Sequence, residues 1–249
     1  MIVETPRARY RQVADELRKE IRLGKYPAGT LLPSQPELAR KYGLNQTSIN
    51  RAIALLRAEG LVRVEHGVGA FVQEIPTVKR VRRIPRSDGS GSSFAEEVQK
   101  VGLKPHAPLV GLDIVPAPAM VAERLGLAEN DPVVRRRRHM FVGERPVQLA
   151  ISYIPLEIAG GEEIALPDTG PSGLYRRLGD RGYPIERFVE EIEARHPTEE
   201  EAEFLRLTDA QHVLEVVRIA YAANNVAAET VTNVLPSQQW RLSYEWTAS

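Results

Sequence analysis

The segment 30–73 constrains the fold of this 249-residue chain more than any other part of its sequence. Two helical patterns lie close together in it, and a hairpin pattern follows them. Ser34 and Glu37 form an S-x-x-E capping box, which predicts the start of a short helix, and Gly43 supplies the turn after it. Asn45 is a favourable N-cap for a second, longer helix.

The longer helix is predicted to run to about residue 59 and to have two distinct faces. Apolar residues follow the spacing of a buried stripe, at Ile49, Ala52, Ile53 and Leu56. The opposite face near its N-terminus is rich in amide and hydroxyl groups and free of acid: Gln46, Thr47, Ser48, Asn50 and Arg51. An earlier helix is predicted from apolar residues at three- and four-residue steps, at Tyr10, Val13, Leu17 and Ile21.

A hairpin closed by His66-Gly67-Val68-Gly69 completes the order of a winged helix-turn-helix, whose longer helix fits the major groove of DNA. We therefore predict that Gln35, Gln46, Thr47, Ser48, Asn50 and Arg51 contact DNA. The alternative, an ordinary solvated helix face, would favour pairs of Glu and Lys. In the wing we add Arg63, His66 and Gly67, because glycine lets the backbone approach a phosphate and His66 can enter the minor groove.

The charge distribution separates the chain into two parts. Residues 1–86 hold 17 Lys and Arg against 8 Asp and Glu, whereas the remainder holds 16 against 25. The chain as a whole has no net charge. An excess of nine positive charges in the first part and nine negative charges in the second indicates that only the first part meets a polyanion. The alternative is that the two domains merely differ in charge.

Several classes of protein are disfavoured by what the sequence lacks. Without cysteine it has neither disulfides nor thiolate metal sites, and it shows no signal-peptide core and no apolar run that predicts a membrane span. We therefore expect a cytoplasmic protein. The five histidines have no metal-binding spacing, and G-x-S-x-G, a phosphate loop and G-x-G-x-x-G are all missing, so we predict no catalytic residues, no metal and no cofactor.

Residues 76–92 are predicted to be a linker between a DNA-binding domain at 1–75 and a second domain at 93–249. Pro76, Pro85 and the run Ser-Asp-Gly-Ser-Gly-Ser-Ser break regular structure. The basic residues of this stretch, which are Lys79, Arg80, Arg82, Arg83 and Arg86, either add phosphate contacts or belong to a solvated tether.

The second domain alternates short helical and strand-like patterns. Strands are predicted over 109–115, 133–142, 147–154, 186–195, 213–222 and 226–235. Helices are predicted over 93–101, 118–125, 172–180 and 199–205, and Thr198 with Glu201 forms a capping box before the last. Because most strands are adjacent and linked by hairpins, we expect a mixed, largely antiparallel α+β domain.

Several motifs in register give the first domain a family resemblance. They are Y-x-x-V-x-x-x-L-x-x-x-I from Tyr10, G-x-x-L-P-S from Gly29, A-x-x-Y-G from Ala39, L-x-x-E-G-L from Leu56 and G-x-G-x-F-V from Gly67. Together they resemble the DNA-binding domain of GntR-family bacterial transcription regulators. The chain has Gln35-Pro36 and Asn45-Gln46-Thr47-Ser48-Ile49-Asn50 where the family often has arginine. This departure predicts a different operator, with adenine read by Gln46 or Asn50.

The second domain resembles the effector-binding (UTRA) domain of the HutC subfamily, which shares its fold with chorismate lyase. The matching motifs include R-P-V at Arg145, S-Y-I-P at Ser152, G-L-Y at Gly173 and A-R-H-P-T at Ala194. The resemblance implies an effector site at Phe94, Arg136, Arg138, Ser152, Ser172 and Glu229. A second arginine and a tyrosine of phosphosugar-sensing relatives are replaced by Met140 and Leu235, which weakens the case for a phosphorylated sugar.

Strand alternation adds a separate expectation for the arginine run at 135–138. Arg136 and Arg138 share one face of the strand, and Arg135 and Arg137 share the other. One face then lines an anion pocket and the other is solvated. The alternative is four surface arginines paired with the acidic excess.

The resemblance implies a homodimeric transcription regulator that binds a pseudo-palindromic, double-stranded DNA operator and whose affinity is modulated by an unknown small-molecule effector. We expect a repressor. The alternatives are a ligand-independent DNA-binding repressor and a chorismate-lyase-like enzyme, for which fold kinship is weak evidence.

Overall fold

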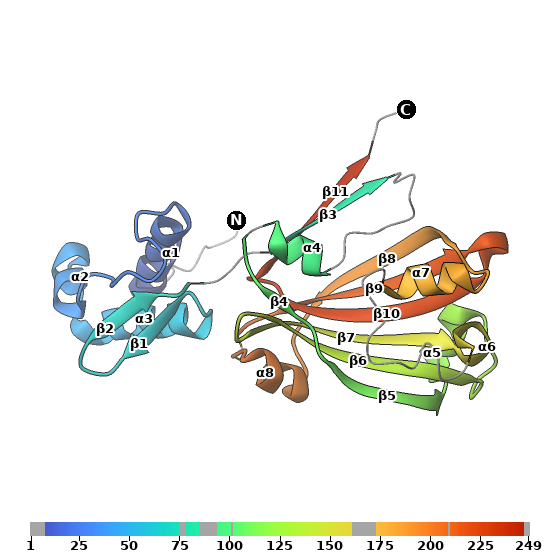
Figure 1. The fold of residues 1–249 in the computed structure, drawn as a ribbon. Helices are drawn as coiled ribbons and strands as arrows, with labels where there is room; N and C mark the ends of the chain where they lie inside the picture. Colours follow the sequence, from blue (N-terminus) through green and yellow to red (C-terminus); the bar gives the residue numbers. More distant parts are fainter. Residues whose placement is uncertain are drawn as a thin grey trace, which may run out of the picture. The chain divides into compact units, whose positions relative to one another are not determined.

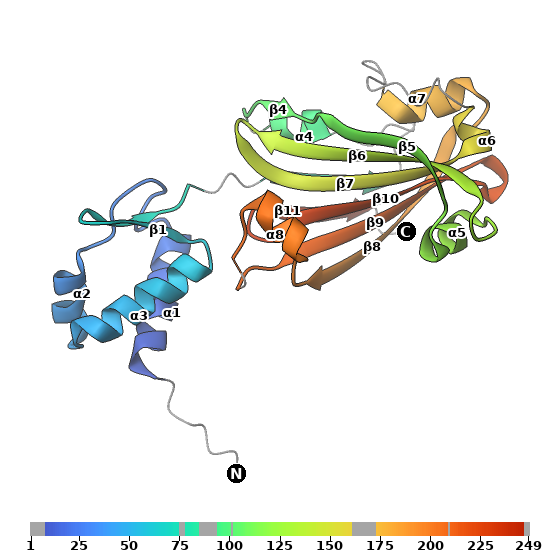
Figure 2. The ribbon, with the colours of Figure 1, turned by 90° about the horizontal axis from the view of Figure 1, so that it is seen from below.

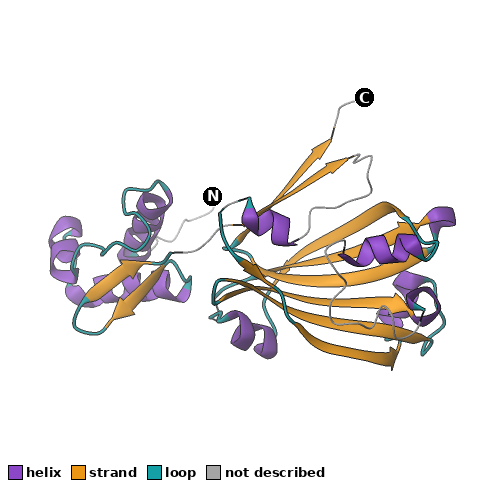
Figure 3. Cartoon of the chain, viewed as in Figure 1, coloured by secondary structure: helices purple, strands orange, loops and turns teal. Residues whose placement is uncertain are grey.

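The structure, a computed structural model, describes residues 8–74, 78–84, 94–100, 102–160, 173–208 and 210–246. The chain divides into two compact units (Figure 3). The first comprises residues 1–76 and 207–211, and the second comprises residues 77–206 and 212–249.

The first unit contains three helices and a two-stranded hairpin. The helices are α1 (Arg9–Arg22), α2 (Gln35–Tyr42) and α3 (Gln46–Ala58). The strands β1 (Val62–Glu65) and β2 (Gly69–Val72) pair antiparallel, with Val62 opposite Val72. Both predicted caps are present: Ser34 and Glu37 form a capping box, and the Asn45 side chain accepts a hydrogen bond from the Ser48 N–H. The predicted winged helix-turn-helix is confirmed.

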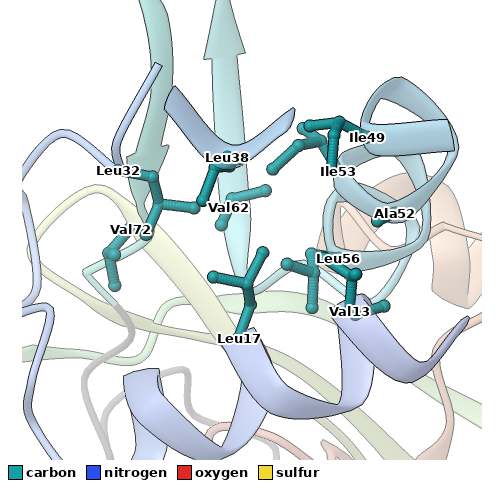
Figure 4. Packing of buried hydrophobic residues seen from close by; sticks show 11 residues of the cluster. Val13, Leu17, Leu32, Leu38, Ile49, Ala52, Ile53, Leu56, Val62 and Val72 are labelled. Atoms are coloured by element: carbon teal, nitrogen blue, oxygen red, sulfur yellow. The ribbon is translucent and has the colours of Figure 1, made fainter. Parts of the chain in front are cut away.

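One hydrophobic core holds these elements together (Figure 4). Leu17 of α1, Leu38 of α2 and Leu56 of α3 are fully buried in it, and the hairpin contributes Val62 and Val72. The buried stripe predicted for the longer helix is also in this core. Because that stripe faces inward, the polar face of α3 is turned to solvent.

The second unit is built on a seven-stranded antiparallel sheet (Figure 1). Its strand order is β4-β6-β7-β10-β9-β8, and β5 also pairs with β6. The strands are β4 (Pro105–His106), β5 (Leu109–Pro116), β6 (Pro132–Val142), β7 (Arg145–Pro155), β8 (Ile185–Arg195), β9 (Val213–Ala222) and β10 (Ala227–Pro236). The predicted antiparallel α+β fold is therefore confirmed.

Helices cover both faces of the sheet (Figure 2). On one face, α6 (Leu156–Ala159) and α7 (Gly173–Asp180) bury one apolar cluster, and α4 (Phe94–Gln99) buries a second. On the other face, α5 (Ala119–Leu125) buries a third cluster, and α8 (Glu199–Leu205) packs Phe204 against His139 and Phe141. The capping box predicted for α8, Thr198 with Glu201, is present.

The structure adds a parallel ribbon that the sequence did not predict. Strand β3 (Val78–Ile84) pairs with the last strand, β11 (Trp240–Trp246), with Val78 opposite Trp240. Both residues are buried in the cluster beneath α4. The stretch predicted as a tether, 76–92, therefore holds a strand of the second unit. The apolar residues of β3 are separated by pairs of basic residues, so its sequence lacks the two-residue alternation that predicts a strand.

Candidate DNA-binding surface and effector site

The N-terminal half of α3 presents an exposed polar surface. Gln46 and Asn50 are four residues apart, as are Thr47 and Arg51, so each pair is stacked on one side of the helix. All four side chains are exposed, and the first turn of the helix has no acidic residue. The positive end of the helix dipole adds attraction for phosphate there. These groups can donate to base edges or phosphate oxygens.

Two further predicted residues border this surface. Gln35 at the start of α2 accepts a hydrogen bond from Gln46 Nε2 at 3.3 Å, so the two helices present a joined amide pair. Ser48 is half-buried, and its backbone N–H donates to Asn45 Oδ1 at 2.9 Å. Ser48 therefore lies at the edge of the polar surface, whereas Gln46 lies within it.

The wing places its predicted residues on an exposed hairpin. His66 and Gly67 form the turn between β1 and β2, and Gly67 has a positive φ of 76°. The Arg63 guanidinium lies over the Phe71 ring at 4.4 Å and forms an ion pair with Glu65. Arg63 is therefore partly committed within the wing, and it must leave Glu65 to contact a phosphate.

A contact that sequence reasoning missed fixes α3 against α1. The Arg18 guanidinium donates from Nε to Glu59 Oε2 at 2.7 Å and also contacts Asp15. Glu59 lies directly after α3, so this ion pair ties the C-terminal end of the helix to the unit's core. The spacing between positions 18 and 59 gives no local signal for such a pair.

The predicted effector residues gather on the sheet face beneath α7. In the sheet register, Arg136 of β6 lies opposite Ser152 of β7. Glu229 of β10 and Arg136 are both buried, with 4% and 3% of their surfaces exposed. Arg136, Arg138 and Glu229 interact electrostatically, so the structure brings together four of the six residues predicted for this site.

The electrostatics of this cluster show a buried, positively charged site. Burial raises the pKa of the Glu229 carboxyl, against the opposing effect of hydrogen bonds from Tyr175 and Ser152 and of the nearby guanidinium groups. Burial lowers the pKa of Arg136 to about 10, and the charges of Arg138 and Arg177 add to that effect. Arg136 and Arg138 thus act on the Glu229 carboxyl group, and Arg177 acts on Arg136.

Tyr175 and Arg177, both on α7, are absent from the predicted site. The G-L-Y motif at Gly173 contains Tyr175 and offers the sequence signal for it. Arg177 follows two residues later with no motif of its own. Its charge acts on Arg136 because Leu174 and Leu178 pack α7 onto the sheet.

The other two arginines of the run point to the opposite face, as strand alternation predicts. Arg135 donates to both carboxylate oxygens of Asp113, at 2.9 and 2.6 Å, and its hydrogen bonds lower the pKa of Asp113. The Arg137 side chain is 46% exposed and lies 3.9 Å from the same carboxylate. Of the four arginines of this run, Arg136 and Arg138 therefore remain as candidates to hold an anion on the sheet face beneath α7.

The remaining predicted residues have different outcomes. Phe94 lies on α4, where its ring centroid is 6.3 Å from that of Trp240, in the cluster beneath α4 rather than the one beneath α7. Ser172 lies outside the described residues, as does Arg86. Arg80, considered a possible phosphate contact, is instead buried and ion-paired with Glu97. It is therefore not available to DNA in this structure.

The described part of the chain offers neither a membrane-spanning helix nor a cluster of metal-binding side chains. None of its helices is long and apolar enough to cross a membrane. Nor do the described residues contain a group of three or more His, Cys, Asp or Glu side chains that could hold a metal ion.

Two family models match the chain. Residues 9–72 match the model of bacterial regulatory proteins of the gntR family, and residues 100–241 match the UTRA domain. An uncharacterized HTH-type transcriptional regulator of Streptomyces coelicolor is 31% identical, covering 96% of this chain and 92% of that protein. The HTH-type transcriptional repressor NagR of Bacillus subtilis is 25% identical, covering 93% of this chain and 91% of NagR.

A solved structure agrees with these matches over both units. The crystal structure of a GntR-family transcriptional regulator superposes with a TM-score of 0.66 at 28% identity, covering 98% of this chain and 99% of that one. The similarity therefore extends to the order of the two domains and to the fold of each.

Proposed function

We propose that this chain, which belongs to the gntR family of bacterial regulatory proteins and carries a UTRA domain, is a repressor controlled by a small anionic effector. It is a DNA-binding transcription regulator and not an enzyme, in agreement with the sequence prediction and with its HutC-type domain order. The repressor sign is supported by its similarity to the repressor NagR. Its proposed place of action is the cytoplasm, where bacterial DNA lies.

The DNA-binding role is proposed to depend on the polar surface of α3 and on the wing. Gln46, Thr47, Asn50 and Arg51 would enter the major groove, with Gln35 and Ser48 at the border of the contact. Arg63, His66 and Gly67 would lie against the backbone and the minor groove. The observation that supports this arrangement is the acid-free, exposed N-terminal half of α3.

The effector is proposed to be an anion because of the charges that line the site. Arg136 and Arg138 carry positive charges near the Glu229 carboxyl group, and Arg177 adds a third near Arg136. The positive charges of these guanidinium groups would favour a negatively charged ligand over a neutral one. Ser152 offers a hydroxyl group to the ligand. Phe94 and Ser172 are retained as proposed contacts from the family resemblance.

Two such chains are proposed to bind one operator. A dimer with two-fold symmetry presents two recognition helices, which matches a pseudo-palindromic DNA sequence. Effector binding would alter operator affinity because the two binding equilibria belong to one molecule and are linked. We propose that 1–75 is the DNA-binding domain and that the effector-binding domain, predicted over 93–249, also includes β3 of the segment 76–92.

A two-part experiment tests this function. The full chain is used to select an operator from random DNA, and small anions and neutral metabolites are screened for a rise in its unfolding temperature. We expect anions alone to raise it, and the same anions to change operator affinity about fivefold or more. A selected operator whose affinity no anion changes would instead support the ligand-independent repressor. Turnover of a chorismate-like compound would contradict the assignment as a regulator.

A further inference from the structure

Strand β3, the first strand of the second unit after the DNA-binding unit, is anchored by a buried charge. Arg80 of β3 is only 4% exposed, and its guanidinium donates from Nε to Glu97 Oε2 of α4 at 3.0 Å. The same guanidinium lies 4.7 Å from the centre of the Trp240 ring of β11. The linker strand is thus fixed to a helix and to its partner strand through one side chain.

The contact continues into the central sheet as a chain of buried amides. Arg80 Nη2 donates to Gln148 Oε1 of β7 at 3.0 Å. Gln148 Nε2 then donates to Asn233 Oδ1 of β10 at 2.7 Å, and Asn233 Nδ2 donates to the Val216 carbonyl oxygen at 3.3 Å. This buried network, which comprises Arg80, Glu97, Gln148 and Asn233, therefore reaches from β3 across three strands of the sheet.

The network shares two strands with the proposed effector site. Helix α4 carries Glu97 of the network, and its Phe94 packs in the cluster with Trp240 rather than in the one beneath α7. Gln148 lies four residues from Ser152 on β7, and Asn233 lies four residues from Glu229 on β10. Residues four apart on a strand share a face at a separation of about 13 Å. Strands β7 and β10 thus each carry one residue of the proposed effector site and one residue of the buried network.

Stability alone does not account for a buried ion pair at this place. An apolar pair of similar volume generally stabilises a protein interior as well or better, whereas buried polar groups can fix one specific arrangement. Hydrogen bonds have a preferred direction. When one helix or strand in such a network shifts, the side chains bonded to it must therefore move as well. The buried network has such bonds at every step from α4 and the central strands to β3.

We infer that the buried network transmits occupancy of the effector site to β3, and through β3 to the DNA-binding unit. The inference rests on the proposed function, since it assigns the route by which an anion in that site changes operator affinity. An anion that draws β7 or β10 toward itself changes the positions of Gln148 and Asn233. Arg80 follows Gln148, because its donors are directed at Glu97 and Gln148.

The test uses inorganic phosphate as the anion and the full chain with its selected operator. The double variant Arg80→Met/Glu97→Leu removes both charges together, so that neither is left buried without its partner. A second variant, Gln148→Met, interrupts the network at one amide. Phosphate affinity is measured by calorimetry, and operator affinity is measured by fluorescence anisotropy with and without phosphate. The matched control is Arg135→Met/Asp113→Leu, which removes an ion pair from the opposite face of the sheet.

In the wild type and the control, phosphate is expected to change operator affinity about fivefold or more. In the double variant and in Gln148→Met, phosphate is expected to bind with wild-type affinity while the change in operator affinity is lost. A full change in operator affinity in both network variants would overturn the network's role and leave the effector site intact. Absence of phosphate binding to the wild type would contradict the anion site itself, and the inference would fail with it. Because Gln148→Met leaves the ion pair in place, it gives a result even if the double variant does not fold.

Discussion

At the scale of single residues, the chemistry of the second unit is concentrated in Glu229 and the guanidinium groups around it. The buried Glu229 carboxyl has a raised pKa, so the folded state binds a proton more tightly than the unfolded chain does. Its contribution to stability is complete below the unfolded pKa and is lost as the pH rises through the higher, folded pKa. The same proton equilibrium sets the net charge that an anion meets in the site.

Replacement of Glu229 by glutamine should therefore flatten the dependence of stability on pH. The variant Glu229→Gln keeps the shape of the side chain but cannot ionise. Its stability relative to the wild type should therefore increase as the pH rises above the unfolded pKa of Glu229. Thermal unfolding measured across the acidic and neutral range tests this. Parallel wild-type and variant curves would contradict the raised pKa.

Glu201 provides a control of opposite sign. Burial opposes ionisation there, but hydrogen bonds from Arg195 prevail and lower the pKa of Glu201. Its stabilising contribution is present above the unfolded pKa and is lost as the pH falls through the folded pKa. The variant Glu201→Gln should therefore be less stable than the wild type at neutral pH, and the difference should disappear in acid.

Base discrimination is also a property of single residues. If Gln46 and Asn50 read adenine, Gln46→Ala and Asn50→Ala should each reduce discrimination at one operator position by about 1–3 kcal/mol. Footprinting on operators with single base changes measures the loss. Gln12→Ala removes an exposed amide from α1 and serves as the control. Unchanged discrimination in both α3 variants would exclude these residues as readers of sequence.

At the scale of elements, the cap of α3 shows how local sequence sets the recognition surface. The Asn45 side chain accepts a hydrogen bond from the Ser48 N–H, so the helix begins directly before Gln46. The buried stripe from Ile49 to Leu56 then fixes which side faces inward. The cap and the stripe together direct Gln46 and Asn50 to solvent.

Loss of this cap should destabilise the DNA-binding unit. The variant Asn45→Ala should lower the free energy of unfolding by about 1 kcal/mol, because a helix N–H loses its acceptor. Asn45→Asp, which retains an acceptor oxygen, should keep most of that stability. Chemical denaturation followed by circular dichroism measures both. Equal stability of Asn45→Ala and the wild type would show that the cap is energetically unimportant.

Local patterns predicted most elements, and long-range pairing accounts for what they missed. The caps at Ser34, Asn45 and Thr198 and the alternation along 133–154 could be read from short segments. The parallel pairing of β3 with β11 could not, because their partners are about 160 residues apart along the chain. The burial of Arg80 and the approach of Arg177 to Arg136 also depend on tertiary packing, which an arginine in sequence does not reveal.

At the scale of the whole molecule, the charge division near residue 86 does not coincide with the boundary between the units, because β3 with Lys79 and Arg80 belongs to the second unit. The basic part contains the helix-turn-helix, the wing and β3, and the acidic part contains the sheet with the buried Arg136. If the proposed anion site is correct, the negative net charge of residues 87–249 would limit their attraction to DNA, while Arg136 and Arg138 would attract a small anion.

The assembly should be a dimer whose binding to DNA depends strongly on salt. Sedimentation equilibrium of the full chain should give twice the monomer mass.

The logarithm of the operator association constant should fall linearly with the logarithm of the salt concentration, because phosphate contacts release counterions. A monomer that binds the operator with full affinity would contradict the proposed two-fold arrangement.

The most direct test of control by an anion is whether anion binding and operator binding affect each other equally. Phosphate affinity is measured with and without saturating operator, and operator affinity is measured with and without saturating phosphate. Each pair of measurements gives a ratio of affinities, with and without the other ligand. If an anion in the second unit controls the recognition helices, the two ratios must be equal and differ from one. We predict equal ratios of about fivefold or more, with each ligand weakening the other. Ratios of one in both directions would contradict the claim that this chain is an anion-controlled repressor.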